Sequence, residues 1–395
     1  MTAPSWLRAV AAVMRREVAG WRAHPRELLL LAVLPLASGA LFTALLERGT
    51  PSELPVAVVD FDRSALSRRI TRALDASPSM RVSTVLGSTE EAANLVRRGS
   101  VYGIVTVPAD FENDLRRGRA PTVVVDYNAQ WMLPGSLIRR DARTAAATLG
   151  AGVEIAARTA RGEPASVAMA RIEPVQVDAR AVFNPQLNYG HFLLPAVLPA
   201  MLQIFVLLQA VAAVGRELRR ATAGEWLGVA GQRPWAALAG KMALPTAWFA
   251  GLALAMLFLL HRVMHVPMRG RWPVLAGGAV LLVLACQAVG VMLVAWTANL
   301  RLATSLAAFY GGVAFAFAGV TFPLGGMTWG PRAWAELLPL RHYVSLAFEQ
   351  AMRGAPVSAS MPELCALSLF VAVPLALSMP RLATVLRDAR CWGRL

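Results

Sequence analysis

Few residues in this sequence have a type and spacing suited to chemistry. A phosphate-binding loop needs a glycine-rich turn that ends in Gly-Lys-Ser or Gly-Lys-Thr, because the lysine and the hydroxyl contact phosphate and metal. The only lysine is Lys241, and the tripeptide Gly240-Lys241-Met242 lacks the hydroxyl. The motifs Gly-x-Ser-x-Gly and His-Glu-x-x-His are also absent from the sequence. We therefore expect no ATPase site, no catalytic residue and no cofactor in this chain.

Histidine and cysteine positions give little support to a metal site or a disulfide. His261 and His265 are four residues apart and would share one face of a helix. Two ligands without a third are a weak zinc signature, so we favour a pair of solvated histidines at a membrane interface. The three cysteines all lie outside the segment 47–190, which must therefore fold without disulfides.

The elements that carry these residues are long apolar helices. The chain has 395 residues, and 56% of them are hydrophobic, more than in an ordinary soluble protein. The excess lies in uncharged runs near the length, about 20 residues, that crosses a bilayer as a helix. These runs are 28–46, 192–214, 242–260, 272–300, 302–324 and 364–380. The sequence thus predicts a polytopic α-helical membrane protein with six transmembrane helices, the fourth and fifth forming a tight hairpin around Arg301.

The net charge of +15 is concentrated beside these apolar runs. A basic fringe of this kind is typical of membrane topology and of contact with the lipid bilayer, so we expect no nucleic-acid partner. With the N-terminus inside, the short cytoplasmic segments carry Arg8, Arg15, Arg16, Arg22, Arg26, Arg216, Arg219, Arg220, Arg233, Lys241, Arg301, Arg381, Arg387, Arg390 and Arg394. The two shorter outer loops carry Arg262, Arg269, Arg271, Arg332, Arg341 and Arg353. The positive-inside rule then predicts cytoplasmic termini, including a tail at 381–395, and an external segment 47–190.

The first 27 residues have the pattern of an amphipathic helix. Apolar residues recur at spacings of three and four, and arginines fall mostly on the other face. The apolar set is Leu7, Val10, Met14, Val18 and Trp21, and the basic set is Arg8, Arg15, Arg16 and Arg22. We expect the segment 1–27 to lie in the cytoplasmic interface. A helix packed on another subunit is the alternative.

The segment 47–190 has the pattern of an inserted α/β domain with a mixed sheet, because strand-like and helical stretches alternate in it. The expected strands are 56–59, 101–107 and 122–125. The expected helices begin at Ser64, which has Leu66, Ile70 and Leu74 on one face, at a capping box of Ser88 and Glu91, at 109 and at 136. Gly99 ends the second of these helices, Gly118 ends the third, and the fourth extends to residue 160.

The remainder, 191–380, is a five-helix membrane bundle with a charged inner loop at 215–241. This loop contains Arg216, Glu217, Glu225 and Trp226, and a proline starts the next span. A short charged helix of this kind is suited to docking a soluble partner, and a solvated turn is the alternative.

Two further features bear on passage through the membrane. Gln203 and Gln209 in the second span either line a translocation path or hydrogen-bond neighbouring helices. The outer segment 325–362 mixes polar residues with Trp329 and Trp334. It predicts either two short re-entrant helices in the outer leaflet or an amphipathic surface loop. The spans themselves contain no acidic residue, which argues against an ion-coupled carrier.

Four groups of short motifs follow one another along the chain. They are Arg15-Arg16-Glu17 with His24-Pro25-Arg26 and Pro35; 58–64 with Ser67-Arg68-Arg69 and 103–119; Phe183-Asn184-Pro185 with Arg216-Glu217 and 224–227; and Thr321-Phe322-Pro323 with Leu338-Pro339-Leu340 and His342-Tyr343. In this order, and with the predicted topology, they resemble the permease subunit of type-2 ABC exporters. The resemblance is specifically to the subfamily with a large extracytoplasmic domain after the first membrane helix. The resemblance covers nearly the whole chain.

The resemblance implies a half-transporter of the bacterial inner membrane, with the large domain in the periplasm. A second permease copy or a paralogue would complete the translocation path, and separate ATP-binding cassette subunits would drive it. The loop 215–241, with Glu217 and Glu225, would receive their movement, and the N-terminal helix would be a second contact. Relatives often work with a periplasmic adaptor protein and an outer-membrane channel. Replacement of Glu217 by arginine would then uncouple ATP hydrolysis from transport without unfolding the permease.

A membrane receptor or scaffold that displays the external domain, without transport, is the alternative function. A fixed receptor needs only one or two spans. Six spans with a structured inner loop therefore favour the permease.

Overall fold

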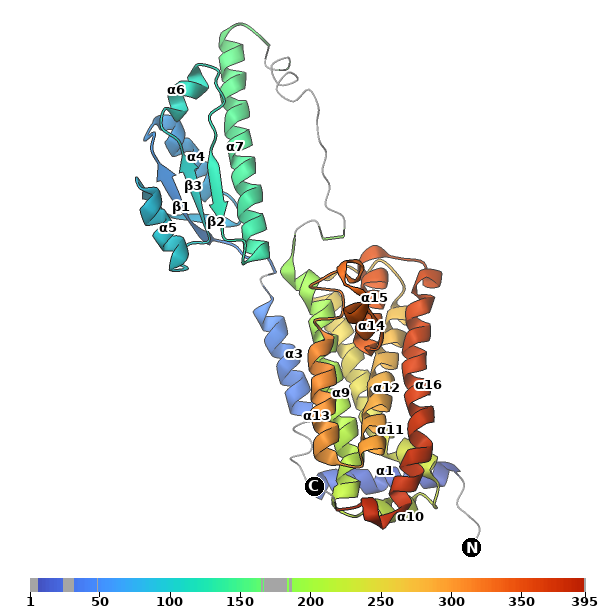
Figure 1. The fold of residues 1–395 in the computed structure, drawn as a ribbon. Coiled ribbons are helices and arrows are strands. Elements are labelled where there is room, and N and C mark those ends of the chain that lie inside the picture. The colour runs from blue at the N-terminus through green and yellow to red at the C-terminus, as the bar shows by residue number, and fades with distance from the viewer. Residues whose placement is uncertain are drawn as a thin grey trace. The chain divides into compact units, whose positions relative to one another are not determined.

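The computed structural model describes residues 6–23, 32–47, 49–164, 166, 183–184 and 187–393. The chain divides into two compact units (Figure 1). One comprises Met1–Gly49 and Ala181–Leu395 and is called the helical unit; the other comprises Thr50–Arg180 and is called the α/β unit. The motif residues His24, Pro25, Arg26 and Pro185 lie outside the described residues, as do residues 28–31 of the first predicted span.

The α/β unit is built on a sheet with the strand order β2-β1-β3-β4. The strands are β1 (Leu54–Asp60), β2 (Met80–Leu86), β3 (Gly103–Val107) and β4 (Val124–Tyr127). The helices are α4 (Ala65–Asp75), α5 (Thr89–Arg97), α6 (Phe111–Arg116) and α7 (Met132–Ala160). β1 is parallel to both β2 and β3, whereas β3 and β4 are antiparallel. The sheet is therefore mixed, as the sequence predicted.

Local sequence accounts for much of this unit. The side chains of residues 56–59 are fully buried, as a central strand requires. The Ser64 side chain accepts a hydrogen bond from the Ser67 backbone N–H at 3.0 Å and so caps α4, whose Leu66, Ile70 and Leu74 are buried on one face. Ser88 begins α5 without a side-chain cap hydrogen bond, so the predicted capping box is wrong in that detail.

The helical unit is a bundle with short helices at both ends (Figure 1). Its long helices are α9 (Tyr189–Arg219), α11 (Pro234–Phe258), α12 (Trp272–Thr297) and α16 (Val357–Arg387), and α3 (Leu34–Leu45) and α13 (Leu300–Ala314) pack beside them. At one end lie α1 (Trp6–Ala23) and α10 (Ala223–Val229), and at the other lie α14 (Trp329–Glu336) and α15 (Pro339–Ala347). We call the end that holds α1 and α10 the α10 end.

Within the described residues, four helices are long and apolar enough to cross a membrane: Tyr189–Arg219, Pro234–Val263, Trp272–Thr297 and Val357–Arg387. They contain the predicted spans 192–214, 242–260 and 364–380 and most of 272–300. The last helix continues through Pro362, Pro374 and Pro380 and is longer than predicted. Prolines are tolerated in this way in membrane helices. α3 is a shorter apolar helix inside the first predicted span.

The fifth predicted span, 302–324, is wrong at its C-terminal end. Its helix, α13, ends at Ala314, and turns follow. Gly319 has a positive φ of 81°, and Pro323 cannot donate a helical hydrogen bond, so neither residue continues the helix. The predicted hairpin before it is present, with Ala298 in the left-handed region and the Asn299 side chain capping α13.

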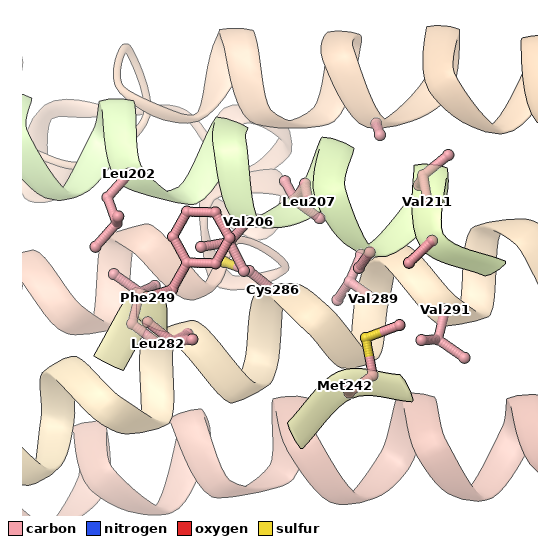
Figure 2. Packing of buried hydrophobic residues seen from close by; sticks show 14 of the residues in the cluster. Leu202, Val206, Leu207, Val211, Met242, Phe249, Leu282, Cys286, Val289 and Val291 are labelled. Atoms are coloured by element: carbon pink, nitrogen blue, oxygen red, sulfur yellow. The ribbon is translucent and has the colours of Figure 1, made fainter. Parts of the chain in front are cut away.

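The core of the bundle is formed where α9, α11 and α12 meet (Figure 2). Leu202, Val206, Leu207 and Val211 of α9 pack with Met242 and Phe249 of α11 and with Leu282, Cys286, Val289 and Val291 of α12. α9 and α12 approach each other closely at Gly290. A Cβ atom there would lie 2.8 Å from Ala210 Cβ and 3.0 Å from the Leu207 carbonyl oxygen. The absence of a side chain at Gly290 therefore sets the spacing of α9 and α12.

The helical unit holds together the two chain ends that lead into and out of the α/β unit. The Gly49 carbonyl oxygen accepts a hydrogen bond from the Tyr189 backbone N–H at 2.8 Å. Gly49 has a φ of 70°, and a Cβ atom on it would lie 2.5 Å from the Asn188 amide. We call this contact the Gly49–Tyr189 clasp.

The predicted outer segment 325–362 contains the two short helices α14 and α15, and an ionic cluster fixes α15 to α16. Arg341 Nη1 lies 2.7 and 2.8 Å from the two carboxylate oxygens of Glu363. His342 Nδ1 lies 2.6 Å from Glu363 Oε2, and His342 Nε2 lies 3.1 Å from the Glu336 carbonyl oxygen. Arg341 also pairs with the more exposed Glu336 carboxylate at 3.0 Å. The position of these helices relative to a bilayer stays a prediction.

We expect Glu363→Gln to lower the stability of the protein much more than Glu336→Gln, although both carboxylates bind Arg341. Loss of a partner from a buried ion pair costs about 3–5 kcal/mol, whereas an exposed pair contributes about 0–1 kcal/mol. The measurement is the thermal unfolding midpoint of each full-length variant in mild detergent. Equal shifts for the two variants would contradict the assignment of Glu363 as the residue that joins α15 to α16.

Candidate functional site

Glu217, near the C-terminal end of α9, is the centre of an ionic cluster at the α10 end. Its carboxylate accepts two hydrogen bonds from the Arg16 guanidinium of α1, at 2.7 and 2.9 Å. Lys241 Nζ of α11 lies 2.8 Å from Glu217 Oε1 and 2.5 Å from Glu17 Oε1. Thr222, which precedes α10, donates from Oγ1 to Glu217 Oε2 at 2.6 Å. One carboxylate thus joins α1, α9 and α11 to the start of α10.

The cluster is largely shielded from solvent. Glu217 is 8% exposed and Lys241 is 3% exposed. Charges at such positions are stable only when opposite charges and hydrogen bonds compensate for lost hydration. Here two cations, Arg16 and Lys241, face two anions, Glu17 and Glu217. The hydrogen bond to Glu217 raises the pKa of Arg16 further above its ordinary value, so this side chain stays charged.

Trp226 anchors α10 to α11. Its ring is fully buried, and its Nε1–H donates to the Ala237 carbonyl oxygen at 3.2 Å. Lys241 Nζ lies 4.9 Å from the ring centroid, close enough for a cation–π interaction. The turns on either side of α10 use positive φ values at Ala221, Gly231 and Gln232, which keep the connection short. α10 is therefore held by the buried Trp226 side chain and by the hydrogen bond from Thr222 to Glu217 of α9.

A cavity of about 190 Å³ adjoins this cluster. Its charged lining comes from Arg16, Glu17, Arg216, Glu217, Arg220 and Lys241. The other face of α10 is open, because Glu225, Gly228 and Val229 are exposed. The predicted set thus divides into three: Arg216 and Glu217 line the cavity, Trp226 is a buried anchor, and Glu225 is on the surface.

The predicted path residues Gln203 and Gln209 lie inside the helical unit. Gln203 Nε2 donates to the Gly311 carbonyl oxygen of α13 at 3.1 Å, so this amide hydrogen-bonds a neighbouring helix. Gln209 is also buried. The amide oxygens of both residues have no hydrogen-bond partner in the described part of the chain.

The predicted shared helix face of His261 and His265 is wrong. His261 lies in a π-helical turn, Leu259–Val263, that ends α11, with Nδ1 at 2.9 Å from the Val266 carbonyl oxygen. His265 follows the helix and has a φ of 54°. Among the described residues, no group of three or more His, Cys, Asp and Glu side chains is placed to hold a metal ion.

α1 packs on α11 of its own chain, and the location of residues 1–27 in the cytoplasmic interface stays a prediction. Ala9 and Val13 are buried against α11, where a Cβ atom on Gly240 would lie 2.6 Å from Val13 Cβ. Leu7, which belongs to the predicted apolar face, is 72% exposed. Small residues pack here because they allow two helix backbones to approach closely.

The sequence did not predict Arg16, Glu17, Thr222 or Lys241 as members of the site. Lys241 carries the one signal that was available, since it is a lone lysine at the start of an apolar span. Such a charge is costly in a membrane helix without a partner, and therefore predicts a nearby anion. The identity of that anion follows only from the fold, because Glu17 is 224 residues and Glu217 is 24 residues from Lys241 in the sequence.

Comparison with known proteins identifies the family. The model of the family described as "ABC-2 family transporter protein" matches residues 26–379. No curated protein matches the sequence. The matched region includes the long apolar helices α9, α11 and α12, most of α16 and the whole α9–α10–α11 connection. The chain therefore belongs to the ABC-2 transporter family and is a membrane-embedded permease of an ABC transporter system.

Proposed function

We propose that this protein is the permease subunit of an ATP-driven exporter in a bacterial inner membrane, and that separate ATPase subunits act on it at the α10 end. Both termini are then cytoplasmic, and the α/β unit is periplasmic. The chain itself binds no nucleotide. The observation that carries the proposal is the construction of α10, which is anchored from inside by Trp226 and exposed outside at Glu225 and Val229.

The ionic cluster supplies the physical link for such a mechanism. A force on α10 reaches α9 through Thr222 and Glu217, and it reaches α11 through Trp226 and Lys241. Arg16 adds α1 to the same body. Movement of the ATPase subunits on ATP binding would therefore shift the cytoplasmic ends of several helices together, which opens the path between two permease chains.

We propose that the second permease chain, an identical copy or a paralogue, packs against α13. This helix uses Ala303, Ala307 and Gly311 against its own bundle. Its other side leaves Leu302, Leu306 and Phe309 exposed. On this proposal the path forms where α9 and α13 of the two chains meet, and a periplasmic adaptor with an outer-membrane channel receives the cargo at the α/β unit.

The experiment is purification of the tagged full-length protein from mild detergent, with mass spectrometry of the proteins recovered with it. We expect a stoichiometric ATP-binding cassette subunit. Glu225→Arg should abolish its recovery, because this exposed side chain lies on α10 and a surface substitution of this kind rarely unfolds a protein. Glu90→Arg, an equal charge reversal at an exposed position of α5, is the control and should leave recovery unchanged.

Two outcomes would count against the proposal. Recovery of folded protein without any ATPase subunit would favour a receptor or scaffold. Equal recovery with the wild type and with Glu225→Arg would place the ATPase contact away from α10.

A further inference from the structure

The segment that follows α16 packs against α10. α16 ends at Arg387, and Ala389–Cys391 forms one turn of 3₁₀ helix. Trp392 Nε1 then donates to the Val385 carbonyl oxygen at 3.0 Å, which folds the indole back along its own helix. The Gly393 backbone N–H donates to the Leu218 carbonyl oxygen of α9 at 2.8 Å. The chain after α16 is therefore tied to the end of α9.

The indole of Trp392 lies directly on Gly224. A Cβ atom on Gly224 would lie 2.7 Å from Trp392 Cη2, with Cζ3 and Cζ2 next nearest at 3.5 and 3.6 Å. The absence of a side chain at Gly224 therefore leaves room for the ring. Gly228 in the same helix has no heavy atom of the described residues within 4 Å of such a Cβ, and provides a natural comparison.

These contacts give α10 a second anchor. Trp226 holds it to α11 on one side, and Trp392 holds it to α16 on the other. Trp392 and Cys391 are half-buried and pack against the core of the helical unit, so the segment is part of the folded bundle. The ionic cluster around Glu217 does not include α16. α16 also contacts α10 directly. The segment 388–393 adds the ring contact with Gly224 and a hydrogen bond to the end of α9.

We propose that the segment 388–393 is a coupling strap, in which Trp392 is a positioning residue that makes α16 move with α10. This inference rests on the proposed function, because it assumes that an ATPase subunit acts on α10. It adds α16 to α1, α9 and α11 as a helix that moves with α10. It assigns this coupling to the contact of the Trp392 ring with Gly224.

The chain's own cysteines provide the measurement. Cys365 is exposed on α16, toward the end of that helix remote from Trp392, whereas Cys286 is buried. In a Cys391→Ala background, bimane attached to Cys365 reports movement of α16. The sample is the complex with its ATPase, and the signal is the change in bimane fluorescence when ATP and vanadate are added. We expect a clear change in bimane fluorescence in this background, in which Cys391→Ala is the only substitution in the strap.

Substitutions at the contact then separate coupling from folding. Gly224→Ala, which displaces the ring, and Trp392→Ala, which removes it, should each markedly reduce the fluorescence change while the ATPase stays bound. Gly228→Ala is the matched control and should keep it. Trp392→Phe shortens the ring, so the double variant Gly224→Ala/Trp392→Phe should regain a response that Gly224→Ala alone has lost. A general loss of stability would not be repaired by a second, smaller side chain.

The two proposals fail in different ways. If no ATPase is recovered with the wild type, the proposed function is wrong and no ATPase subunit acts on the strap. If the ATPase is recovered and Trp392→Ala keeps the full fluorescence change, the strap inference is wrong and the proposed function stands.

Discussion

Replacement of Glu217 by glutamine is expected to destabilise the protein strongly and to abolish coupling to the ATPase. The glutamine keeps the shape of the side chain but leaves Arg16 and Lys241 close together with only Glu17 to balance them. Removal of one partner from a buried ion pair costs about 3–5 kcal/mol. The measurements are the thermal unfolding midpoint in detergent and the ATP hydrolysis rate of the purified complex.

A double variant tests the electrostatic origin of this effect. Glu217→Gln/Lys241→Met removes one charge of each sign, so it should recover much of the stability that Glu217→Gln loses. Glu225→Gln is the control within the same connection, and because Glu225 is exposed its effect should stay within about 0.5 kcal/mol. Additive losses in the double variant would show that the cluster is not held together by charge.

The burial of Glu217 also corrects an expectation drawn from the sequence. Glu217→Arg was expected to uncouple transport without unfolding the permease. An arginine there would place a third cation beside Arg16 and Lys241, so unfolding is the expected result. The exposed Glu225 is the position at which a charge reversal can affect the partner alone.

Replacement of Gly290 by alanine is expected to destabilise the contact between α12 and α9. The new Cβ would meet Ala210 Cβ and the Leu207 carbonyl oxygen of α9, and a backbone atom cannot move aside by changing a rotamer. Overpacking of this kind costs about 1–3 kcal/mol. We expect a lower unfolding midpoint in detergent and weaker retention of the folded monodisperse peak on gel filtration.

Gly277→Ala in the same helix gives the opposite expectation. A Cβ on Gly277 has no heavy atom of the described residues within 4 Å, and alanine favours a helix over glycine by up to about 1 kcal/mol. The midpoint should therefore stay the same or rise. Equal losses for Gly277→Ala and Gly290→Ala would mean that α12 itself, and not its contact with α9, determines the effect.

The sequence predicted those elements whose determinants are local. Long apolar runs located α9, α11, α12 and α16, and the spacing of Leu66, Ile70 and Leu74 located α4 and its buried face. β2 was missed because it lies at the edge of the sheet and several of its side chains are exposed, which weakens the apolar pattern. α13 was predicted too long because composition alone does not show that Gly319 adopts a left-handed conformation.

The candidate site was predicted only in part, for a related reason. The loop 215–241 drew attention through its charge and contains Glu217, Thr222 and Lys241. Arg16, which also binds Glu217, comes from α1, 201 residues earlier in the chain. No short-range pattern connects Arg16 or Lys241 to that glutamate. The contact of Trp392 with Gly224 is equally long-range, and one isolated glycine in a charged loop gives no sign of it.

The Gly49–Tyr189 clasp has a consequence for how such proteins are assembled from parts. The helical unit itself brings the two chain ends together. Most of the conformational entropy that is lost in closing the loop between them is therefore lost when the bundle folds, whatever the intervening sequence. The α/β unit is therefore an insertion between two chain positions that the helical unit itself brings together. Evolution can therefore replace the α/β unit by another fold, or shorten it, while the helical unit keeps its fold.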